Sequence, residues 1–262
     1  MSGATTALVL NLTKKLVVLV LIGVSVFALL NASNFLIVKE SFATLWRKRY
    51  TTGHANKSDQ GSNELCPLNI GMNDHLRKEF VLQHNDRRWR TPKHNGTLLP
   101  WVGYMMALKY DCELEELALH FADDMCSGSL WARELPETGL NWLLTDQVYG
   151  RKHALKKACR AWWREYQLLG GVKKNLIYTE TIPKGIRNFT QVIWANTTKL
   201  GCAVKQCSTF YSVVCLYAPR GNRVGDAIYS TGGYCSKCPK GTRCVKNCTD
   251  NREERCGLCY NI

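Results

Sequence analysis

Apolar residues recur with a helical period in the stretch Glu113–Met125. They fall at positions i, i+3, i+4, i+7, i+8 and i+11, on one face of a predicted helix: Leu114, Leu117, Ala118, Phe121, Ala122 and Met125. Three acids, Glu113, Glu115 and Glu116, gather in the first turn, where the helix dipole favours negative charge. We interpret these acids as part of a solvated face.

Two further helices are predicted by the same periodicity. One begins at the capping residues Asn73 and Asp74. It has one apolar face, made of Leu76, Phe80 and Val81. The other is Lys152–Tyr166, whose apolar side consists of Leu155, Ala158, Cys159, Trp162 and Tyr166. The chain therefore offers three amphipathic helices to a common core.

Two apolar runs, GCAV and YSVVCLY, predict strands that pair through a turn around Ser208 and Thr209. Pro219 then ends the second strand. Cys207 and Cys215 flank the turn, and a bridge between them or to a neighbour would fix the register. The segment FTQVIW also favours a strand by propensity.

Composition narrows the class of protein. Of the 262 residues 45% are hydrophobic, which is enough for a buried core, and the formal net charge is +14. The Lys and Arg residues are scattered, with no long basic run, no basic helix and no RNA-binding aromatic signature. We therefore expect no nucleic-acid partner. A solvated basic surface is the simplest interpretation of the charge, and attraction to acidic glycans or anionic surfaces is the alternative.

The first 38 residues have the layout of a secretory signal, because a lysine pair precedes the uncharged apolar run Leu16–Leu30. Apolar residues continue to Val38, so the same segment is long enough for a signal anchor across a bilayer of about 30 Å. Thirteen cysteines favour an oxidising compartment, so the rest of the chain is placed outside the cytosol. Residues 39–65 are polar and are predicted to be a flexible linker.

Residues 226–262 hold almost no aliphatic side chains but many cysteines. The CxxC spacing there also suits a zinc knuckle, but disulfides are favoured outside the cell, and each adds about 2–4 kcal/mol. Because thirteen is odd, one thiol is unpaired or intermolecular, and we assign this role to Cys159. The remaining twelve are disulfide candidates: Cys66, Cys112, Cys126, Cys202, Cys207, Cys215, Cys235, Cys238, Cys244, Cys248, Cys256 and Cys259.

FTQVIWANTTKLGC followed by VVCLYAPRGN closely resembles the paired signature of the CAP superfamily. CPLNIGMNDHLRKEFVLQHNDRR and AIYSTGGYCSKC are similar to its nematode branch, the venom-allergen-like and activation-associated secreted proteins. The resemblance implies an α+β fold, with a three-layer α-β-α CAP sandwich at residues 66–225 and a cysteine-rich C-terminal extension at 226–262. It also implies that FTQVIW is helical, against its propensity, and that His84 is packed and hydrogen-bonded rather than a ligand.

Many members of that family hold a divalent metal in a cavity with two histidines and two glutamates, a donor set that suits zinc. In this chain the loop after Cys126 has no histidine, Leu140 stands at the first glutamate and Asn188 at the last histidine. Glu165 alone is retained. We therefore predict no metal, no cofactor and no catalytic residue, with a structural Glu165 hydrogen-bonded beside Asn188 or Gln191.

The resemblance implies a secreted or membrane-tethered, non-catalytic interaction protein at a host–parasite or other extracellular interface. Its partner is an unknown extracellular protein or lipid, and it touches a membrane only through residues 1–38, if these are uncleaved. A lipid or sterol carrier is the alternative, and the lost donors oppose a metal-dependent hydrolase. Among seven N-x-S/T triplets, Asn56 and Asn95 are the favoured glycosylation candidates, because they lie in polar stretches.

Overall fold

The structure is a computed structural model that describes residues 61–91, 99–129, 135, 137–146, 150–167, 176–182, 184–245 and 256–262. The predicted signal or anchor segment and most of the predicted linker lie outside these residues. Within the described ranges, no helix is long and apolar enough to cross a bilayer.

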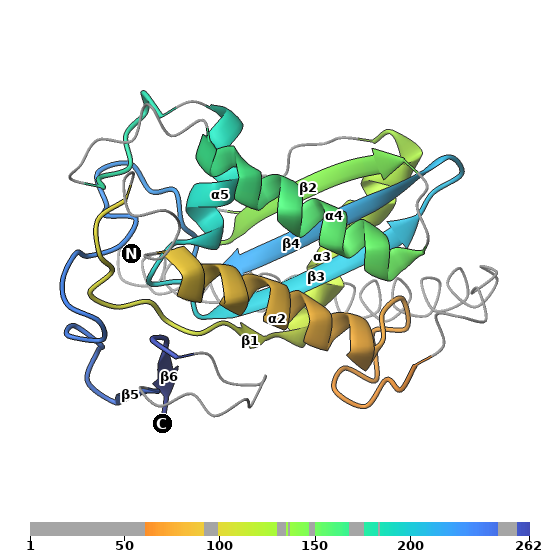
Figure 1. Cartoon of the computed structure of the whole chain (residues 1–262). Coiled ribbons are helices and arrows are strands. Elements are labelled where there is room, and N and C mark those ends of the chain that lie inside the picture. Colours follow the sequence, from red (N-terminus) through yellow and green to blue (C-terminus); the bar gives the residue numbers. More distant parts are fainter. Residues whose placement is uncertain are drawn as a thin grey trace, which may run out of the picture. The chain divides into compact units, whose positions relative to one another are not determined.

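The central sheet has the strand order β1-β3-β4-β2 (Figure 1). Its strands are β1 Lys109–Tyr110, β2 Gly139–Asp146, β3 Lys199–Gln206 and β4 Phe210–Ala218. β1 is parallel to β3, whereas β4 pairs antiparallel with both β3 and β2. The predicted hairpin is confirmed, because the three residues that contain Ser208 and Thr209 join β3 to β4, and Pro219 follows the end of β4.

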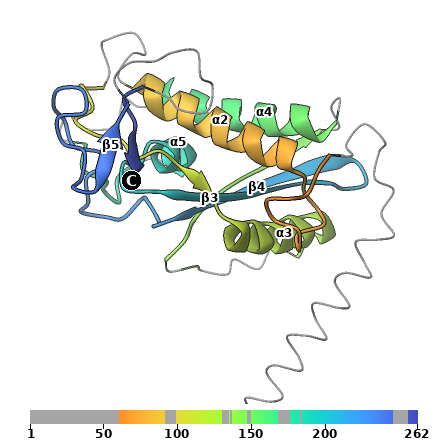
Figure 2. The same ribbon diagram turned by 90° about the horizontal axis from the view of Figure 1, so that it is seen from below.

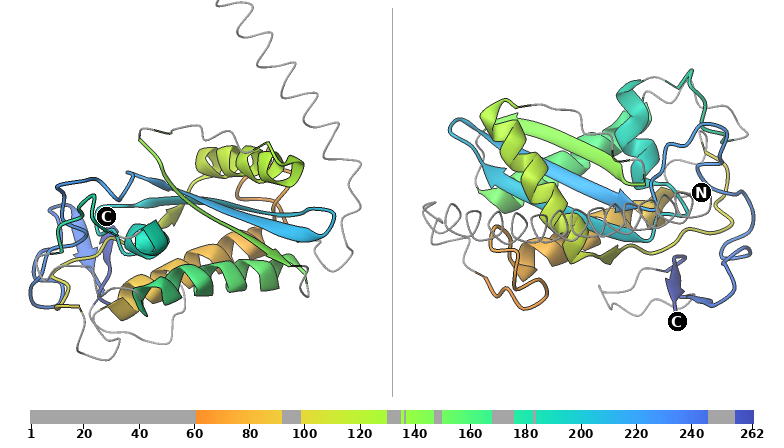
Figure 3. Two further views of the ribbon diagram at one scale, coloured as in Figure 1. Left: turned by 90° about the horizontal axis from the view of Figure 1, so that it is seen from above. Right: turned by 180° about the vertical axis from the view of Figure 1, so that it is seen from behind.

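Helices cover both faces of this sheet (Figure 2). α2 Asp74–Arg90, α4 Arg151–Arg164 and the short α5 Arg187–Val192 lie on one face. α3 Cys112–Ser127 lies on the other face. Viewed along the sheet, the molecule has three layers, α, β and α (Figure 3). The predicted fold class is therefore confirmed.

α3 is well defined by its ends and by its fit to the sheet. The Asp111 side chain accepts a hydrogen bond from the first turn and caps the helix, and Gly128 closes it with a φ of 74°. The helix lies so close to β3 that a Cβ atom at Gly201 would stand 2.2 Å from the backbone nitrogen of Glu115. Gly201 is thus required by close packing.

The predicted apolar face of α3 needs two corrections. Leu117 is 40% exposed, and Glu115, interpreted as solvated, is fully buried together with Leu119. The buried face is therefore rotated from the predicted one. Glu115 tolerates burial because the equally buried Arg77 of α2 reaches it, with 2.7 Å between Nη2 and Oε1 and 2.8 Å between Nε and Oε2.

α2 buries a face that is largely polar. Asn73 caps its first turn as predicted, by accepting from the backbone nitrogen of Leu76 at 2.9 Å. Val81, predicted on the buried face, is only half-buried. The buried residues of the helix are Leu76, Arg77, Phe80, His84, Asn85 and Arg88. Its apolar periodicity is weak because four of these six buried residues are polar or charged.

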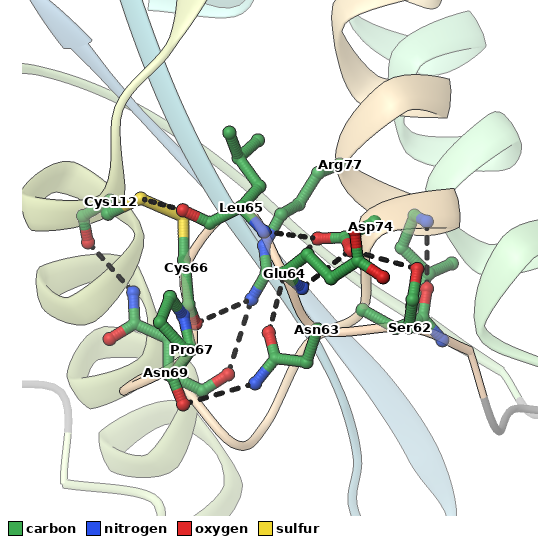
Figure 4. A network of polar contacts seen from close by, with 12 residues as sticks. Ser62, Asn63, Glu64, Leu65, Cys66, Pro67, Asn69, Asp74, Arg77 and Cys112 are labelled. Carbon is green, nitrogen blue, oxygen red and sulfur yellow. Dashed lines mark hydrogen bonds and ion pairs between the residues drawn. A yellow bond between two sulfur atoms is a disulfide. The ribbon is translucent and has the colours of Figure 1, made fainter.

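The N-terminal end of α2 is held by charge (Figure 4). Besides Glu115, Arg77 contacts Asp74, with 2.7 Å between Nη1 and Oδ1. Asp74 in turn accepts from the backbone nitrogens of Glu64 and Leu65. Burial alone opposes the charge of Arg77, but the two carboxylates accept its hydrogen bonds and raise its pKa overall. The network fixes the chain before α2 onto the start of the helix.

The C-terminal end of α2 is held differently. The guanidinium of Arg88 is fully buried and donates six hydrogen bonds, of 2.7–3.2 Å, to main-chain carbonyls. The acceptors belong to Met106, Val192, Trp194, Ala195 and Thr197. Burial lowers the pKa of Arg88 to about 9. This side chain therefore joins the stretch before β1 to the segment that links α5 and β3.

Three further elements test the sequence analysis. FTQVIW lies mainly in α5, so the strand expected from propensity is wrong and the helix implied by the resemblance is confirmed. α4 ends at Arg164, so Tyr166 lies beyond it and is half-buried. No prediction was made for β2, whose residues alternate between buried and exposed positions.

The disulfides tie the layers and the C-terminal region together. They join Cys66 to Cys112, Cys126 to Cys207, Cys202 to Cys215, Cys235 to Cys244, and Cys238 to Cys259. Cys256 is also disulfide-bonded, and Cys248 lies outside the described residues. The two cysteines beside the β3–β4 turn thus bond to neighbours rather than to each other. Cys159 is free and buried, as predicted.

The C-terminal region is built against the sandwich through main-chain hydrogen bonds. Its strands β5 Thr242–Cys244 and β6 Cys259–Asn261 form a small second sheet. The backbone nitrogen of Cys259 donates to Met105 at 2.8 Å, and that of Ala107 donates to Cys259 at 2.9 Å. Figure 1 shows β6 beside the stretch that leads into β1.

Candidate functional site

Glu165, one of the residues predicted to line a degenerate cavity, lies directly after α4. Its Oε1 accepts from the Asn188 side-chain amide at 2.6 Å, and its Oε2 accepts from the backbone nitrogen of Phe189 at 2.9 Å. Asn188 and Phe189 lie in the first turn of α5, where unpaired N–H groups point outward. Glu165 therefore caps a helix that belongs to another part of the chain. The predicted contact between Glu165 and Asn188 is present in the structure.

The electrostatics of Glu165 agree with a capping role. Burial raises the pKa of Glu165, and the hydrogen bonds from Asn188 and Phe189 oppose this shift without reversing it. Both carboxylate oxygens already have partners within hydrogen-bond distance. A metal ion at this carboxylate would share each oxygen with a hydrogen bond that already holds α5.

A second set of polar groups lies next to this carboxylate and was not predicted as a unit. Asn141 of β2 donates to the backbone oxygen of Asn188 at 3.0 Å and to the hydroxyl of Tyr217 at 3.1 Å. Tyr217 is 2.8 Å from Nε2 of His84, whose Nδ1 is 2.8 Å from the backbone oxygen of Phe80. The three side chains linked by these hydrogen bonds, those of Asn141, Tyr217 and His84, are all buried.

The partners fix the protonation of His84. Because the carbonyl of Phe80 can only accept, Nδ1 carries the proton and Nε2 accepts from Tyr217. Burial lowers the pKa of His84 to about 3, and the nearby Arg87 and Arg88 add to the effect. His84 is therefore a neutral, packed and hydrogen-bonded histidine, as predicted.

Leu140 and Gln191 make their contacts away from the pair formed by Glu165 and Asn188. Adjacent strand residues point to opposite faces, so Leu140 points away from the face of Asn141 and is 36% exposed. Gln191 is buried, accepts from the backbone nitrogen of Gly221 at 2.9 Å and donates to Thr197. Its side chain needs the space at Gly139, where a Cβ would stand 2.0 Å from Oε1. It acts as a spacer between α5 and the end of β4.

The donors gathered here do not suit zinc. Zinc sites combine several imidazole, thiolate or carboxylate donors, whereas this cluster offers one engaged carboxylate and neutral amides. The loop after Cys126, which lies partly outside the described residues, contributes no histidine by sequence. What the arrangement can do is hold α4, α5 and β2 in register.

Other predicted site residues have these positions. Burial raises the pKa of Cys159 to about 12, so its thiol stays protonated and weakly nucleophilic. The sulfurs of Cys235, Cys238 and Cys244 lie within 4.8 Å of one another, and each belongs to a disulfide. Asn56 and Asn95 lie outside the described residues.

Comparison with known proteins agrees with this architecture. Residues 83–217 match the cysteine-rich secretory protein family, also called CAP. The chain belongs to this family.

The similar proteins include nematode secreted proteins. Ancylostoma secreted protein of Ancylostoma caninum is 33% identical over 192 residues, which cover 70% of this chain and 45% of that protein. The crystal structure of Na-ASP-1 is 32% identical with a TM-score of 0.62, over 76% of this chain and 50% of that one. That of NaASP2 with Zn²⁺ is 30% identical with a TM-score of 0.58, over 72% and 97%. The chain thus spans about half the length of the first two relatives.

Proposed function

We propose that this protein is a non-catalytic, extracellular CAP-domain interaction protein. The observation that carries the proposal is the state of Glu165, the one retained glutamate. Both of its oxygens are used to cap α5 and to hold Asn188. The described groups that hydrogen-bond this carboxylate are an amide and a backbone nitrogen, which differ from the imidazole-rich donor set that holds the metal-bound water of hydrolases.

An extracellular location is supported by the disulfides and by the relatives. Five disulfides join described residues, a number that reducing compartments do not sustain. One relative carries the word secreted in its name. The role is therefore that of a rigid, bridged scaffold whose surface binds an extracellular partner.

Zinc titration by calorimetry tests this proposal. The disulfide-intact chain should show no site at the cavity tighter than about 1 mM. The variant Asn188→His places an imidazole beside Glu165 and should bind zinc measurably more tightly. Circular dichroism of both proteins checks that the fold is kept.

The control variant for this titration is Glu165→Gln, which removes the carboxylate charge but keeps the shape. Zinc binding that survives in it arises elsewhere, for example at reduced C-terminal cysteines. Micromolar binding by the unmodified chain that disappears in Glu165→Gln would refute the proposal.

A lipid carrier is the second candidate, and one observation favours it. The side chains Leu140, Trp142 and Leu144 of the edge strand β2 form an apolar stripe, each being 36–43% exposed. Quenching of tryptophan fluorescence by a spin-labelled fatty acid would test it. The expected result is saturable quenching that Trp142→Ala reduces, and unsaturable quenching would remove this candidate.

A further inference from the structure

α4 presents a basic stripe to solvent that the sequence analysis missed when it found no basic helix. The helix RKHALKKACRAWWR holds six Lys or Arg residues and no acid. Five basic side chains recur at i, i+3, i+4, i+7 and i+11, and so share one face: His153, Lys156, Lys157, Arg160 and Arg164. We call this set the α4 stripe. It is about 17 Å long.

The stripe faces outward because the other side of α4 is packed on the sheet. Ala154, Leu155, Ala158, Cys159 and Trp162 are buried. In contrast, His153, Arg160 and Arg164 are exposed, and the side chains of Lys156 and Lys157 are each 43% exposed. Figure 1 shows α4 on the near side of the sheet, next to α2.

Few acids neutralise the stripe. Glu79 of α2 lies 3.4 Å from Lys156 and 3.7 Å from Lys152, and Asp146 lies 3.9 Å from Lys157. Asp146 is 99% exposed, so this pair is weak. Among the described residues, Arg160 and Arg164 form no ion pair. Positive charge continues onto α2, because Arg87 lies near enough to Arg160 for mutual repulsion.

The geometry favours a linear, flexible polyanion as the partner. A membrane-binding helix needs an apolar face to insert, and the apolar face of α4 is already buried. Sequence-specific nucleic-acid binding needs aromatic or groove-reading groups between the charges, and the stripe has only basic ones. Guanidinium and ammonium groups in a row match anionic groups repeated along a chain.

We propose that the α4 stripe binds sulfated polysaccharide of the extracellular matrix or cell surface. The proposal rests on the extracellular role inferred above and gives that role a partner class. The contacts are charge-assisted hydrogen bonds from Lys156, Lys157, Arg160 and Arg164 to sulfate groups. Binding does not involve the Glu165 cavity, so the zinc titration and this proposal fail independently.

Heparin, chemically desulfated heparin and phosphatidylserine vesicles are the probes for the disulfide-intact chain. Affinity for heparin is measured by calorimetry at several salt concentrations, and it should fall as salt rises. Desulfated heparin, which keeps its carboxylates, should bind at least roughly tenfold more weakly, because its charge density is lower. Heparin should also bind more tightly than vesicles.

The variant Lys157→Gln with Arg160→Gln and Arg164→Gln removes three charges from the stripe. It should weaken heparin binding at least roughly tenfold, since each exposed charge pair changes affinity a few-fold. The matched control, Lys109→Gln with Arg223→Gln and Lys240→Gln, removes three charges from exposed positions outside α4 and should change affinity less than about threefold.

The proposal is overturned if both triple variants lose affinity equally, because the binding then reflects net charge alone. Equal binding of desulfated heparin or tighter binding of vesicles also overturns it. If the triple variant of the stripe does not fold, Arg164→Gln by itself should still weaken heparin binding, and no change would count against the proposal.

Discussion

The two ends of α2 bury the same kind of side chain in different ways. Arg77 is neutralised by the carboxylates of Glu115 and Asp74, whereas Arg88 is surrounded by main-chain carbonyls. The pKa of Arg77 is raised and that of Arg88 is lowered to about 9, so the two environments differ in how well they stabilise a cation. The comparison shows that carboxylates offset the cost of burying a cation. Main-chain carbonyls accept the hydrogen bonds of the cation but do not offset that cost fully.

This difference predicts different sensitivities to mutation. The charged partners of Arg77 are side chains, which can be replaced together with it, although its Nη2 also donates to the backbone oxygens of Cys66 and Asn69. The partners of Arg88 are backbone groups, which no substitution removes. We expect the Arg88 end to be the more fragile of the two.

Arg88→Met should cause the largest loss of stability, at least about 4 kcal/mol in the free energy of unfolding, because several buried carbonyls lose their donors. Arg88→Lys should restore little, since one ammonium group cannot reach all five acceptors. Urea unfolding followed by tryptophan fluorescence measures both. A loss below about 1 kcal/mol for Arg88→Met would show that the carbonyls find other partners. If neither variant folds, the secreted yields of the two still rank them.

Glu115→Gln should cost less, about 3 kcal/mol, because Asp74 still faces Arg77. The double variant Arg77→Met with Glu115→Gln removes both charges and should regain part of this loss. The same unfolding assay on the single and double variants forms a mutant cycle. If the double variant loses more stability than the two single variants lose together, the charges are not what makes this contact stabilising.

His84 lies between Arg77 and Arg88 on the buried face of α2. Its protonation gives a pH-dependent test of how that face tolerates positive charge. Its pKa is lowered from 6.5 to about 3, so below pH 6.5 the unfolded chain binds a proton that the folded chain does not. Stability should therefore fall as the pH drops from about 6.5 toward 3, by about 2 kcal/mol between pH 7 and pH 5.

The control for this effect is His84→Gln, which has no titrating ring. The stability of this variant should lack the pH dependence that His84 contributes between pH 7 and pH 5, although the variant is less stable than the unmodified chain at pH 7. Carboxylate contributions remain in both proteins and cancel in the difference. Identical slopes would mean that His84 binds a proton without unfolding.

The sequence predicted α3, α4 and the β3–β4 hairpin because their apolar patterns are strong, and it located α2 through its capping residue Asn73 despite a weak apolar face. It misjudged buried charge, since pattern analysis treats Glu115 as exposed unless a partner is known. That partner, Arg77, lies 38 residues away, and only the fold brings the two together. The acceptors of Arg88 are carbonyls, which leave no trace in the sequence at all.

The candidate site was predictable only in part. The pairing of Glu165 with Asn188 followed from the family resemblance, since no local spacing joins α4 to α5. Asn141 was not predicted, because the family resemblance points to its neighbour Leu140. Side chains alternate along a strand, so only one of these two can lie on a given face. The α4 stripe was missed because its charges are separated in sequence and become neighbours only on a helix.

The pairing of Cys259 with the stretch around Met105 and Ala107 has a consequence for biosynthesis. The 154 positions from Met105 to Cys259 (259 − 105) take roughly 8 to 30 seconds to synthesise at about 5–20 residues per second. Throughout that interval, the stretch before β1 has been synthesised but lacks its final partner. The edge of the sandwich is therefore completed only after Cys259 has been translated.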